Sequence, residues 1–269
     1  MNFNKKVTIF IPVYNAGDFI RPCVRSAIDQ SYKNIEVIVS DNYSTDNTYE
    51  IVKNEFPEVT CYRNERNLGP VKNFNKIFEY ASGDYCKILC ADDVLYRDCI
   101  AKQVRILDKM DSVVLTTCSR EIINQDDKSI MVRKLPLKQK VYSYDYIVNL
   151  AARKGKNVIG EPTATLFRMS AAKRLNKGFD EVDFYTVDIE YWLRLLGEGD
   201  LYYQKEKLVK FRVSSVSSSV GMVGLKQMKS YWFFLGRMKD VSLINRLLGY
   251  FAVPVNTFGR MLVYRFVVK

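Results

Sequence analysis

The stretch VTIFIPVYN, residues 7–15, decides the expected fold. Its first five residues are apolar or β-branched and end at Pro12, a pattern typical of a strand buried within a parallel sheet. Residues 18–30 then repeat apolar side chains at helical spacing, and a second apolar run follows at 35–39. A strand, a helix and a strand in this order predict a β-α-β unit with a right-handed crossover.

The same alternation continues outward from this unit. Strands are expected at 59–62, 85–90 and 112–118, and helices at 45–56, 71–80 and 97–109. This order predicts an α/β fold with a mostly parallel sheet and helices on both faces. After about residue 120 the pattern loosens: we expect a turn at 125–128, helices at 143–153 and 188–196, a strand at 201–213 and a loop at 213–224.

The composition excludes several kinds of chemistry. The 269 residues carry a net charge of +11 and include no histidine. Catalytic triads with histidine, histidine-ligated zinc and an imidazole base are therefore excluded, and proton transfer falls to carboxylates, Tyr, Lys or Cys. The six cysteines form no Cys-x-x-Cys pair, which indicates free thiols in a reducing, cytoplasmic compartment. Neither a signal peptide nor a transmembrane helix is expected.

Most of the positive charge lies in the C-terminal segment, residues 226–269. This segment has eight Lys or Arg residues, Asp240 as its one acid, and nine aromatic residues. Such a composition predicts a basic amphipathic helical segment that lies on an anionic membrane surface. The alternative is that these helices pack on the rest of the chain and leave a basic solvated face. Nucleic-acid binding is not expected, because the charge lies in an aromatic tail and not on a reading helix.

Polar loops follow three of the expected strands, at 12–15, 40–46 and 91–93. The carboxyl ends of the strands in an open α/β sheet form the usual ligand site. The pair Asp92-Asp93 follows a buried strand, where carboxylates suit Mg²⁺ or Mn²⁺ bridged to substrate phosphates. A helix N-cap is the alternative role for these aspartates.

Four blocks together resemble family-2 glycosyltransferases of the GT-A fold, over about residues 7–215. They are IPVYN (11–15), QSYKNIEVIVSDNYSTD (30–46), NERNLG (64–69) with Asn73, Asn75 and Gly83, and Asp92-Asp93. The resemblance implies an inverting, hexosyltransferase-type enzyme that moves a sugar from a UDP- or dTDP-linked donor to a hydroxyl of a saccharide acceptor. It also implies a role in bacterial surface polysaccharide or lipopolysaccharide assembly, with an acceptor that could be lipid-linked.

The resemblance also implies roles for individual residues. Asp188, which opens the block DIEYWLRL, is the implied catalytic base; a helix N-cap is its alternative role, and Glu190 is the nearest rival base. Asp93 is implied to coordinate Mn²⁺ or Mg²⁺ on the diphosphate, and Asp92 to lie near the ribose or the metal. Asp41 is implied to accept a hydrogen bond from the base of the nucleotide. The nucleotide-binding set is Pro12, Val13, Tyr14, Asn15, Asp41, Tyr43, Asn67, Lys72 and Asp92. A weaker set for the acceptor or the diphosphate is Glu161, Trp192, Arg212 and Ser214.

Three positions depart from the family pattern. Cys90 replaces an additional aspartate of many relatives, and Asn42-Tyr43 replaces the usual Asp-Gly, so that Tyr43 could stack on the base. Ser214 stands where the family pattern has a histidine that helps to bind the metal or the diphosphate. We therefore expect either weaker metal binding or neutralisation of the diphosphate by Arg212 and lysines.

The expected domains are a catalytic domain at 1–220 and a C-terminal helical segment at 221–269. Within the catalytic domain, 1–118 is the nucleotide-sugar half and 119–220 the acceptor half. A non-catalytic, nucleotide-sugar-binding scaffold protein of a glycan assembly complex is the alternative function, although the presence of Asp93 and Asp188 argues against it. A nucleotidyltransferase is disfavoured because residues 12–18 are not a glycine-rich basic loop. We expect a cytoplasmic protein, peripheral at the inner face of the membrane, and an oligomer is compatible with the sequence.

Overall fold

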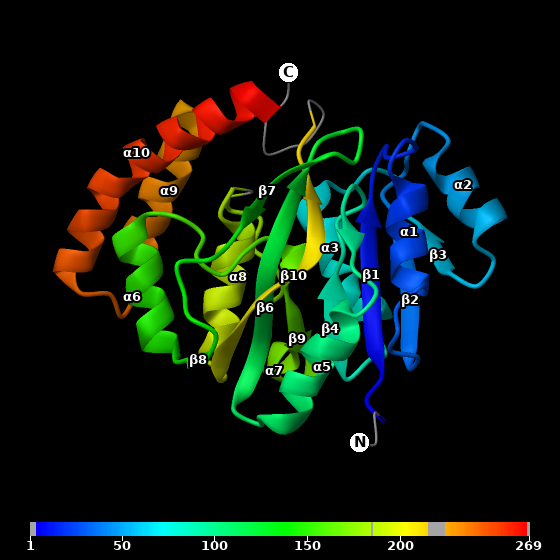
Figure 1. The fold of residues 1–269 in the computed structure, drawn as a ribbon, viewed down its shortest axis with the longest axis horizontal. Coiled ribbons are helices and arrows are strands. Elements are labelled where there is room, and N and C mark those ends of the chain that lie inside the picture. Colours follow the sequence, from blue (N-terminus) through cyan, green and yellow to red (C-terminus); the bar gives the residue numbers. More distant parts are fainter. Residues whose placement is uncertain (1–3, 184, 215–223, 268–269) are drawn as a thin grey trace.

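The computed structural model describes residues 4–183, 185–214 and 224–267 (Figure 1). Its strands are β1 Val7–Val13, β2 Ile35–Asp41, β3 Thr60–Arg63, β4 Tyr85–Ile88, β5 Val94–Leu95, β6 Val113–Ile123, β7 Ser129–Arg133, β8 Val141–Tyr142, β9 Leu166–Arg168 and β10 Asp200–Arg212. Its helices are α1 Ile20–Ile28, α2 Thr48–Glu55, α3 Pro70–Asn75, α4 Ile77–Tyr80, α5 Cys99–Lys109, α6 Tyr144–Lys154, α7 Met169–Arg174, α8 Val187–Leu196, α9 Leu225–Arg237 and α10 Leu243–Val267, with a 3₁₀ turn at Pro162–Ala164.

The central sheet confirms the α/β class and has the strand order β3-β2-β1-β4-β9-β6-β10-β5. The first strands pair in parallel as the sequence predicts, with Val7 opposite Ile35 and Val7 opposite Tyr85. β6 and β10 are also parallel. The expectation of a mostly parallel sheet is too simple, because β9 runs antiparallel between β4 and β6, and β5, β7 and β8 also pair antiparallel. The sheet is therefore mixed.

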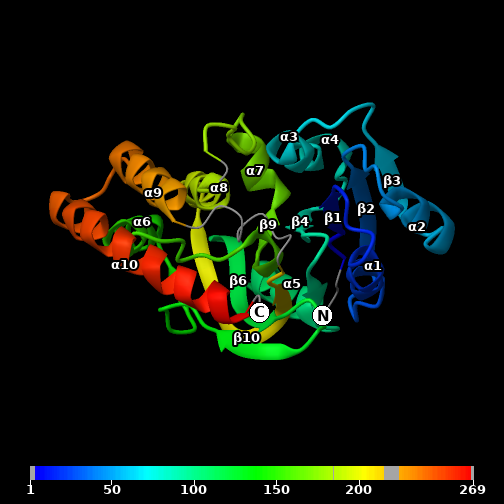
Figure 2. The same cartoon turned by 90° about the horizontal axis from the view of Figure 1, so that it is seen from above.

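Side chains on the two faces of the sheet form two cores. In β1, Val7, Ile9 and Ile11 point into a core that α1, α2 and α5 complete. Phe10 points to the opposite face, into a core with residues of α3, α4, α6, α7 and α8. This alternation follows from the period of two in a strand. Figure 2 shows α3 and α4 on one side of the strands and α1 on the other, as predicted.

Several expected elements have different bounds in the structure. The helix expected at 71–80 is divided into α3 and α4 at Asn75, whose side chain bonds to both backbone groups of Phe179 (Nδ2 to O 3.0 Å, N to Oδ1 2.7 Å). The strand expected at 85–90 ends at Ile88, and the one expected at 112–118 continues to Ile123. Most of the loop expected at 213–224 lies outside the described residues.

The C-terminal helices pack on the rest of the chain. α10 lies along α6 and beside α9, at the outer edge of the molecule (Figure 1). The backbones of α10 and α6 approach closely, since a Cβ on Gly249 would lie 2.0 Å from the Ala152 oxygen. Val253 is buried in the same contact, and Trp232 Nε1 donates to the Tyr250 oxygen at 3.1 Å. Among the described residues, no helix combines the length and the apolar character that crossing a membrane requires.

Candidate active site

A cleft of about 470 Å³ opens where the loops after β1 and β4 meet the 3₁₀ turn and the start of α8. Its lining joins residues that are far apart in the sequence, from Pro12 to Tyr264. Of the residues expected from the sequence, the cleft brings together Pro12, Val13, Tyr14, Asn15, Asn67, Asp92, Glu161, Asp188 and Arg212. The cleft therefore lies at the carboxyl edge of the sheet, which is the usual ligand site of open α/β sheets.

The loop after β1 is fixed to the loop after β2. Asn15 has a positive φ of 50°. Its backbone N donates to Ser44 Oγ at 3.0 Å, and its Oδ1 accepts from Thr45 N at 2.8 Å. These contacts hold residues 12–15 against the cleft without any contribution from a ligand.

A network of side-chain amides supports the same wall and was missed at the sequence level. Asn42 Oδ1 accepts from Asn64 Nδ2 at 3.0 Å and from Leu68 N at 2.9 Å, while Asn42 Nδ2 donates to Asn67 Oδ1 at 2.9 Å. Asn73 is buried and bonds to Ser40 through both ends of its amide. The asparagines of residues 64–73 are visible in the sequence as part of a family motif, but their spacing does not indicate that their side chains form a network.

Asp41, Tyr43 and Lys72 do not line the cleft formed by the described residues. Both Asp41 oxygens accept from Ser44 N at 3.2 Å, and Asp41 Oδ2 is 3.3 Å from Arg63 Nε, so this buried carboxylate shapes the loop. Tyr43 is 47% exposed and lies under the Arg63 guanidinium, with φ at 66°. Lys72 is on the surface, 3.7 Å from Glu181. Their contacts with a nucleotide stay predictions.

The two adjacent aspartates differ in position, and the metal role expected of Asp93 stays a prediction. Asp93 is completely buried; its Oδ2 accepts from Thr163 Oγ1 at 2.5 Å and its Oδ1 from Arg212 N at 2.9 Å. Burial, with the charge of Asp92, raises the pKa of Asp93 well above its usual value. Asp92, in contrast, lines the cleft. Of the two carboxylates, that of Asp92 is therefore the one at the cleft.

The guanidinium of Arg212 bonds within the protein, and the role expected for Arg212 at the diphosphate stays a prediction. Arg212 borders the cleft, but its side chain is 1% exposed. It donates to Asp92 O at 2.8 Å, Asn124 O at 2.9 Å, Gln125 O at 3.2 Å and Asp127 Oδ1 at 2.6 Å. These donors hold the 124–127 turn against the end of β10. The sequence does not indicate these contacts, because three of the four partners are backbone carbonyls.

Two further members of the weaker set lie away from the cleft. Trp192 is fully buried and packs against Phe167, Phe179 and Tyr191 in the core, so it is not available to an acceptor. Ser214 is buried and does not line the cleft of the described residues. The residues that follow it in the expected motif, 215–217, lie outside the described part of the chain.

Asp188 lies at the cleft in the first turn of α8. The N-cap of that helix is Thr186, so the alternative role of Asp188 as the cap is wrong. Burial, the main cause, raises the pKa of Asp188 to about 7, while hydrogen bonds from Ile189 N (2.7 Å) and Asn157 Nδ2 (2.9 Å) oppose that rise. The rival base, Glu190, does not line the cleft of the described residues and lies 3.2 Å from Arg237 Nη2.

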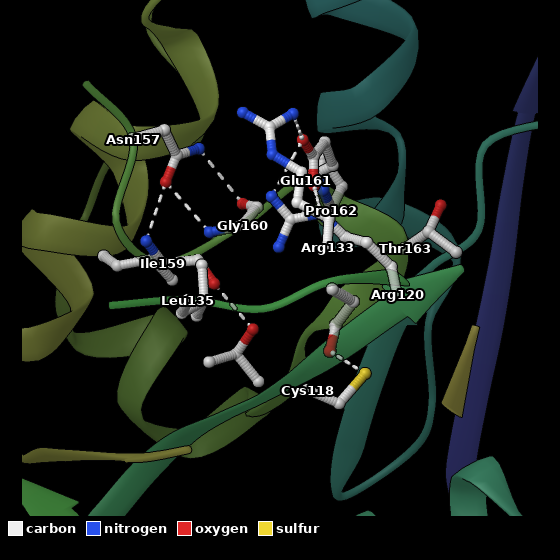
Figure 3. A network of polar contacts seen from close by, with 12 residues as sticks. Cys118, Arg120, Arg133, Leu135, Asn157, Ile159, Gly160, Glu161, Pro162 and Thr163 are labelled. Atoms are coloured by element: carbon white, nitrogen blue, oxygen red, sulfur yellow. Dashed lines mark hydrogen bonds and ion pairs between the residues drawn. The ribbon is translucent and has the colours of Figure 1, made fainter. Parts of the chain in front are cut away.

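Glu161 lines the cleft and takes part in an ion-pair cluster (Figure 3). Arg120 Nη2 donates to Glu161 Oε1 at 3.1 Å and Arg120 Nε pairs with Oε2, while Arg133 Nη1 lies 3.7 Å from Oε1. Burial would raise the pKa of Glu161, but the two guanidinium groups outweigh it and the pKa is lowered. Glu161 is therefore an ionised, paired carboxylate and a poor general base.

Comparison with known proteins agrees with this arrangement. The model of glycosyl transferase family 2 matches residues 8–175. The chain belongs to glycosyl transferase family 2. An uncharacterized glycosyltransferase of Rickettsia typhi is 30% identical over 245 residues, which cover 90% of this chain and 75% of that protein. Abequosyltransferase RfbV of Salmonella typhimurium is 36% identical over 121 residues, 43% of this chain and 36% of that protein.

Solved structures confirm the GT-A fold of this glycosyltransferase. TarS of S. aureus, residues 1–349 in complex with UDP-GlcNAc, superposes with a TM-score of 0.68 at 14% identity and covers 97% of this chain and 72% of its own. The mannosyltransferase PcManGT of Pyrobaculum calidifontis, in complex with GDP-Man and Mn²⁺, gives 0.66 at 16% identity and covers 99% and 74%.

The C-terminal helices of this glycosyltransferase contribute to the cleft, which the sequence did not predict. Tyr231 of α9 and Arg260 and Tyr264 of α10 line it beside Asp188 and Glu161. The Tyr231 hydroxyl accepts from Asn157 N at 3.3 Å and bonds to Arg260. The C-terminal segment, for which membrane contact and packing on the rest of the chain were the two expectations, thus forms part of the cleft lining.

Proposed function

We propose that this glycosyltransferase transfers its sugar with inversion of the anomeric configuration and uses Asp188 as its catalytic base. The carrying observation is the half-buried Asp188 carboxylate, which lies in the cleft with a pKa of about 7. In this reaction the acceptor hydroxyl transfers its proton to Asp188 while its oxygen bonds to the anomeric carbon. The bond from that carbon to the diphosphate breaks on the opposite face, and the nucleoside diphosphate leaves.

The donor end of the cleft is the part formed by residues 12–15, Asn67 and Asp92. TarS is bound to UDP-GlcNAc and PcManGT to GDP-Man, which supports a nucleotide-sugar donor at the same end of this cleft. The described residues contain no cluster of three or more metal-ligating side chains. Donor oxygens would therefore supply most ligands of a Mn²⁺ or Mg²⁺ ion, with Asp92 as its protein carboxylate. Such an ion would stabilise the departing diphosphate.

A transfer assay tests this proposal. The enzyme is incubated with UDP-, dTDP- and GDP-linked sugars and saccharide acceptors, with Mn²⁺ or with EDTA, and the anomeric configuration of the product is read by NMR. We expect a product with inverted configuration and a slower rate in EDTA. A retained configuration would contradict the mechanism. Tight donor binding without turnover across all sugars and acceptors would favour the non-catalytic scaffold function.

We also propose a place for the reaction: the assembly of bacterial surface polysaccharide or lipopolysaccharide, at the membrane. The outer face of α10 supports this, because it carries large exposed apolar side chains at helical spacing. They are Leu243, Ile244, Leu247, Leu248, Phe251, Val255, Phe258, Met261 and Leu262. Exposed basic side chains lie on α9 and α10 or between these two helices. They are Lys226, Lys229, Arg237, Lys239 and Arg265. An apolar stripe with basic neighbours fits an anionic bilayer surface.

Point variants test the membrane contact better than deletion of the tail, because α10 also lines the cleft. We expect F251S/V255S/F258S to lose sedimentation with vesicles of phosphatidylglycerol and phosphatidylcholine, and wild type to bind phosphatidylcholine alone weakly. The matched control is I130S/M131S, which removes exposed apolar side chains on β7. Unchanged sedimentation of the triple variant, or a change confined to its oligomeric state, would contradict membrane docking by this stripe.

A further inference from the structure

The acceptor end of the cleft has more positive than negative side chains. Arg120 of β6, Arg133 of β7 and Arg260 of α10 all line it, and the half-buried Lys156 is next to Asn157 in the adjoining loop. The carboxylates that face them are Glu161 and Asp188. Three arginines and a lysine from four separate segments therefore converge on two acids.

The arginines are only partly satisfied by this arrangement. Glu161 pairs with Arg120 and Arg133. Arg120 is 2% exposed, yet its buried Nη1 has no hydrogen-bond partner among the described residues. An unsatisfied buried donor is costly, and its presence beside a cleft indicates a group that the ligand supplies.

Arg260 is the second incompletely paired cation. Its side chain bonds to the Tyr231 hydroxyl, and the charge of Glu161 raises the pKa of Arg260 less than Tyr231 and Tyr264 do. The environment of Lys156 also has an excess of positive charge. Burial and the nearby Arg133, Lys154 and Arg260 lower the pKa of Lys156. A neutral saccharide would leave these cations uncompensated at the bottom of the cleft.

The loop backbone lies close to the unpaired donor. Gly160 has a φ of 119°, and a Cβ there would lie 3.3 Å from Arg120 Nη1. Glycine at this position therefore lets the loop that also carries Glu161 pass close to Arg120 (Figure 3).

We propose that these cations form a subsite for a phosphate group of the acceptor, next to the hydroxyl that Asp188 deprotonates. Arginine forks match phosphate oxygens in geometry and charge. Arg260, Arg133 and Arg120, which line this end of the cleft, supply the donors for the phosphate oxygens. The assignment of this end to the acceptor rests on the proposed function. The phosphate itself belongs either to a lipid-linked saccharide or to a soluble sugar phosphate.

Binding experiments that need no turnover test the subsite. Isothermal titration measures inorganic pyrophosphate against the full-length protein saturated with UDP, so that the donor end is occupied. We expect R260Q and R133Q each to weaken pyrophosphate binding by roughly tenfold or more, because each removes a charged hydrogen bond. R260K should restore part of the affinity. The control R153Q removes an exposed arginine of α6 and should have no effect.

The same variants separate the subsite from the donor site. We expect the affinity for UDP to change less than twofold in R260Q and R133Q. Absence of pyrophosphate binding in the presence of UDP, or a parallel loss of UDP affinity, would overturn the proposal. If dodecyl phosphate binds more tightly than inorganic phosphate, the acceptor phosphate belongs to a lipid-linked saccharide. If the two affinities are equal, it belongs to a soluble sugar phosphate. Failure of sugar transfer would leave these binding results unaffected.

Discussion

Asn157 fixes the orientation of Asp188: its Nδ2 donates to Asp188 Oδ2 at 2.9 Å. The other end of the same amide, Oδ1, accepts from Ile159 N at 2.8 Å and Gly160 N at 2.9 Å (Figure 3). Nδ2 also donates to the Gly160 oxygen at 3.1 Å, so the amide cannot flip without losing all four bonds. One side chain therefore connects the proposed base to the loop that carries Glu161.

The position of Asp188 predicts how the rate depends on pH. Only the ionised carboxylate can accept the acceptor proton, and burial raises its pKa to about 7. We expect kcat to rise with pH through about 7 and then to level off. A pH profile of kcat measured from 5 to 9 checks this. An acid limb near pH 4, the usual range of an aspartate, would contradict the assignment.

Replacement of Asn157 should move that pH profile. Because its hydrogen bond favours the charged form of Asp188, N157A should raise the pKa of Asp188 further. We expect kcat at pH 7 to fall about three- to tenfold and to recover largely at pH 9. N149A on α6 is the matched control, since Asn149 bonds only to the backbone and Asn245 within the C-terminal packing. A uniform loss of rate at all pH values would indicate a structural defect instead.

The first strands and the loops at their C-terminal ends could be predicted from the sequence, because they depend on residues that are close together in the chain. An apolar run such as Val7–Val13 specifies a buried strand wherever it occurs, and its C-terminal loop then has to lie at the ligand edge. β9 could not be predicted, because Leu166–Arg168 is too short to show a period and its place depends on the free edges of β4 and β6.

The site was predicted in part for the same reason. Asp188 lies in the first turn of a helix and Asp92 follows a strand, and the local sequence pattern predicts both elements. The different roles of Asp92 and Asp93 depend on Thr163, seventy residues away from Asp93. Arg260 reaches the cleft only because Gly249 allows α10 to lie close against α6. Contacts of this kind are tertiary, and no spacing within a segment indicates them.

The two aspartates should respond differently to the same substitution. Asp93 accepts hydrogen bonds from two donors inside the protein, so we expect D93A, which leaves both donors without this acceptor, to lower the free energy of unfolding by about 1–3 kcal/mol. D92A should have a smaller effect on stability and should reduce the Mn²⁺-dependent rate. Urea denaturation and a Mn²⁺ titration of kcat measure the two effects. The reverse pattern would restore Asp93 as the metal ligand.

Gly160 should tolerate no side chain. Its φ of 119° lies in a region that L residues rarely adopt, and a Cβ would press on Arg120 Nη1. We expect G160A to lower the free energy of unfolding by about 1–3 kcal/mol and to slow transfer, because the loop between Asn157 and Glu161 shifts. G259A in α10, where nothing lies within 4 Å, is the control and should be neutral or stabilising. Equal behaviour of both variants would show that the loop is not strained.

The substitution D188N tests the central claim most directly, with sugar transfer, donor binding and thermal unfolding measured on the same preparation at pH 8. The folded-state pKa of Asp188 is raised, so its stabilising contribution is present at low pH and is lost as pH rises through about 7. A neutral Asn should therefore leave Tm at pH 8 equal or higher. We expect kcat to fall by about 10²–10⁴ while donor affinity changes less than twofold, and E190Q to retain the wild-type rate. A D188N rate within tenfold of wild type would contradict Asp188 as the base of this glycosyltransferase.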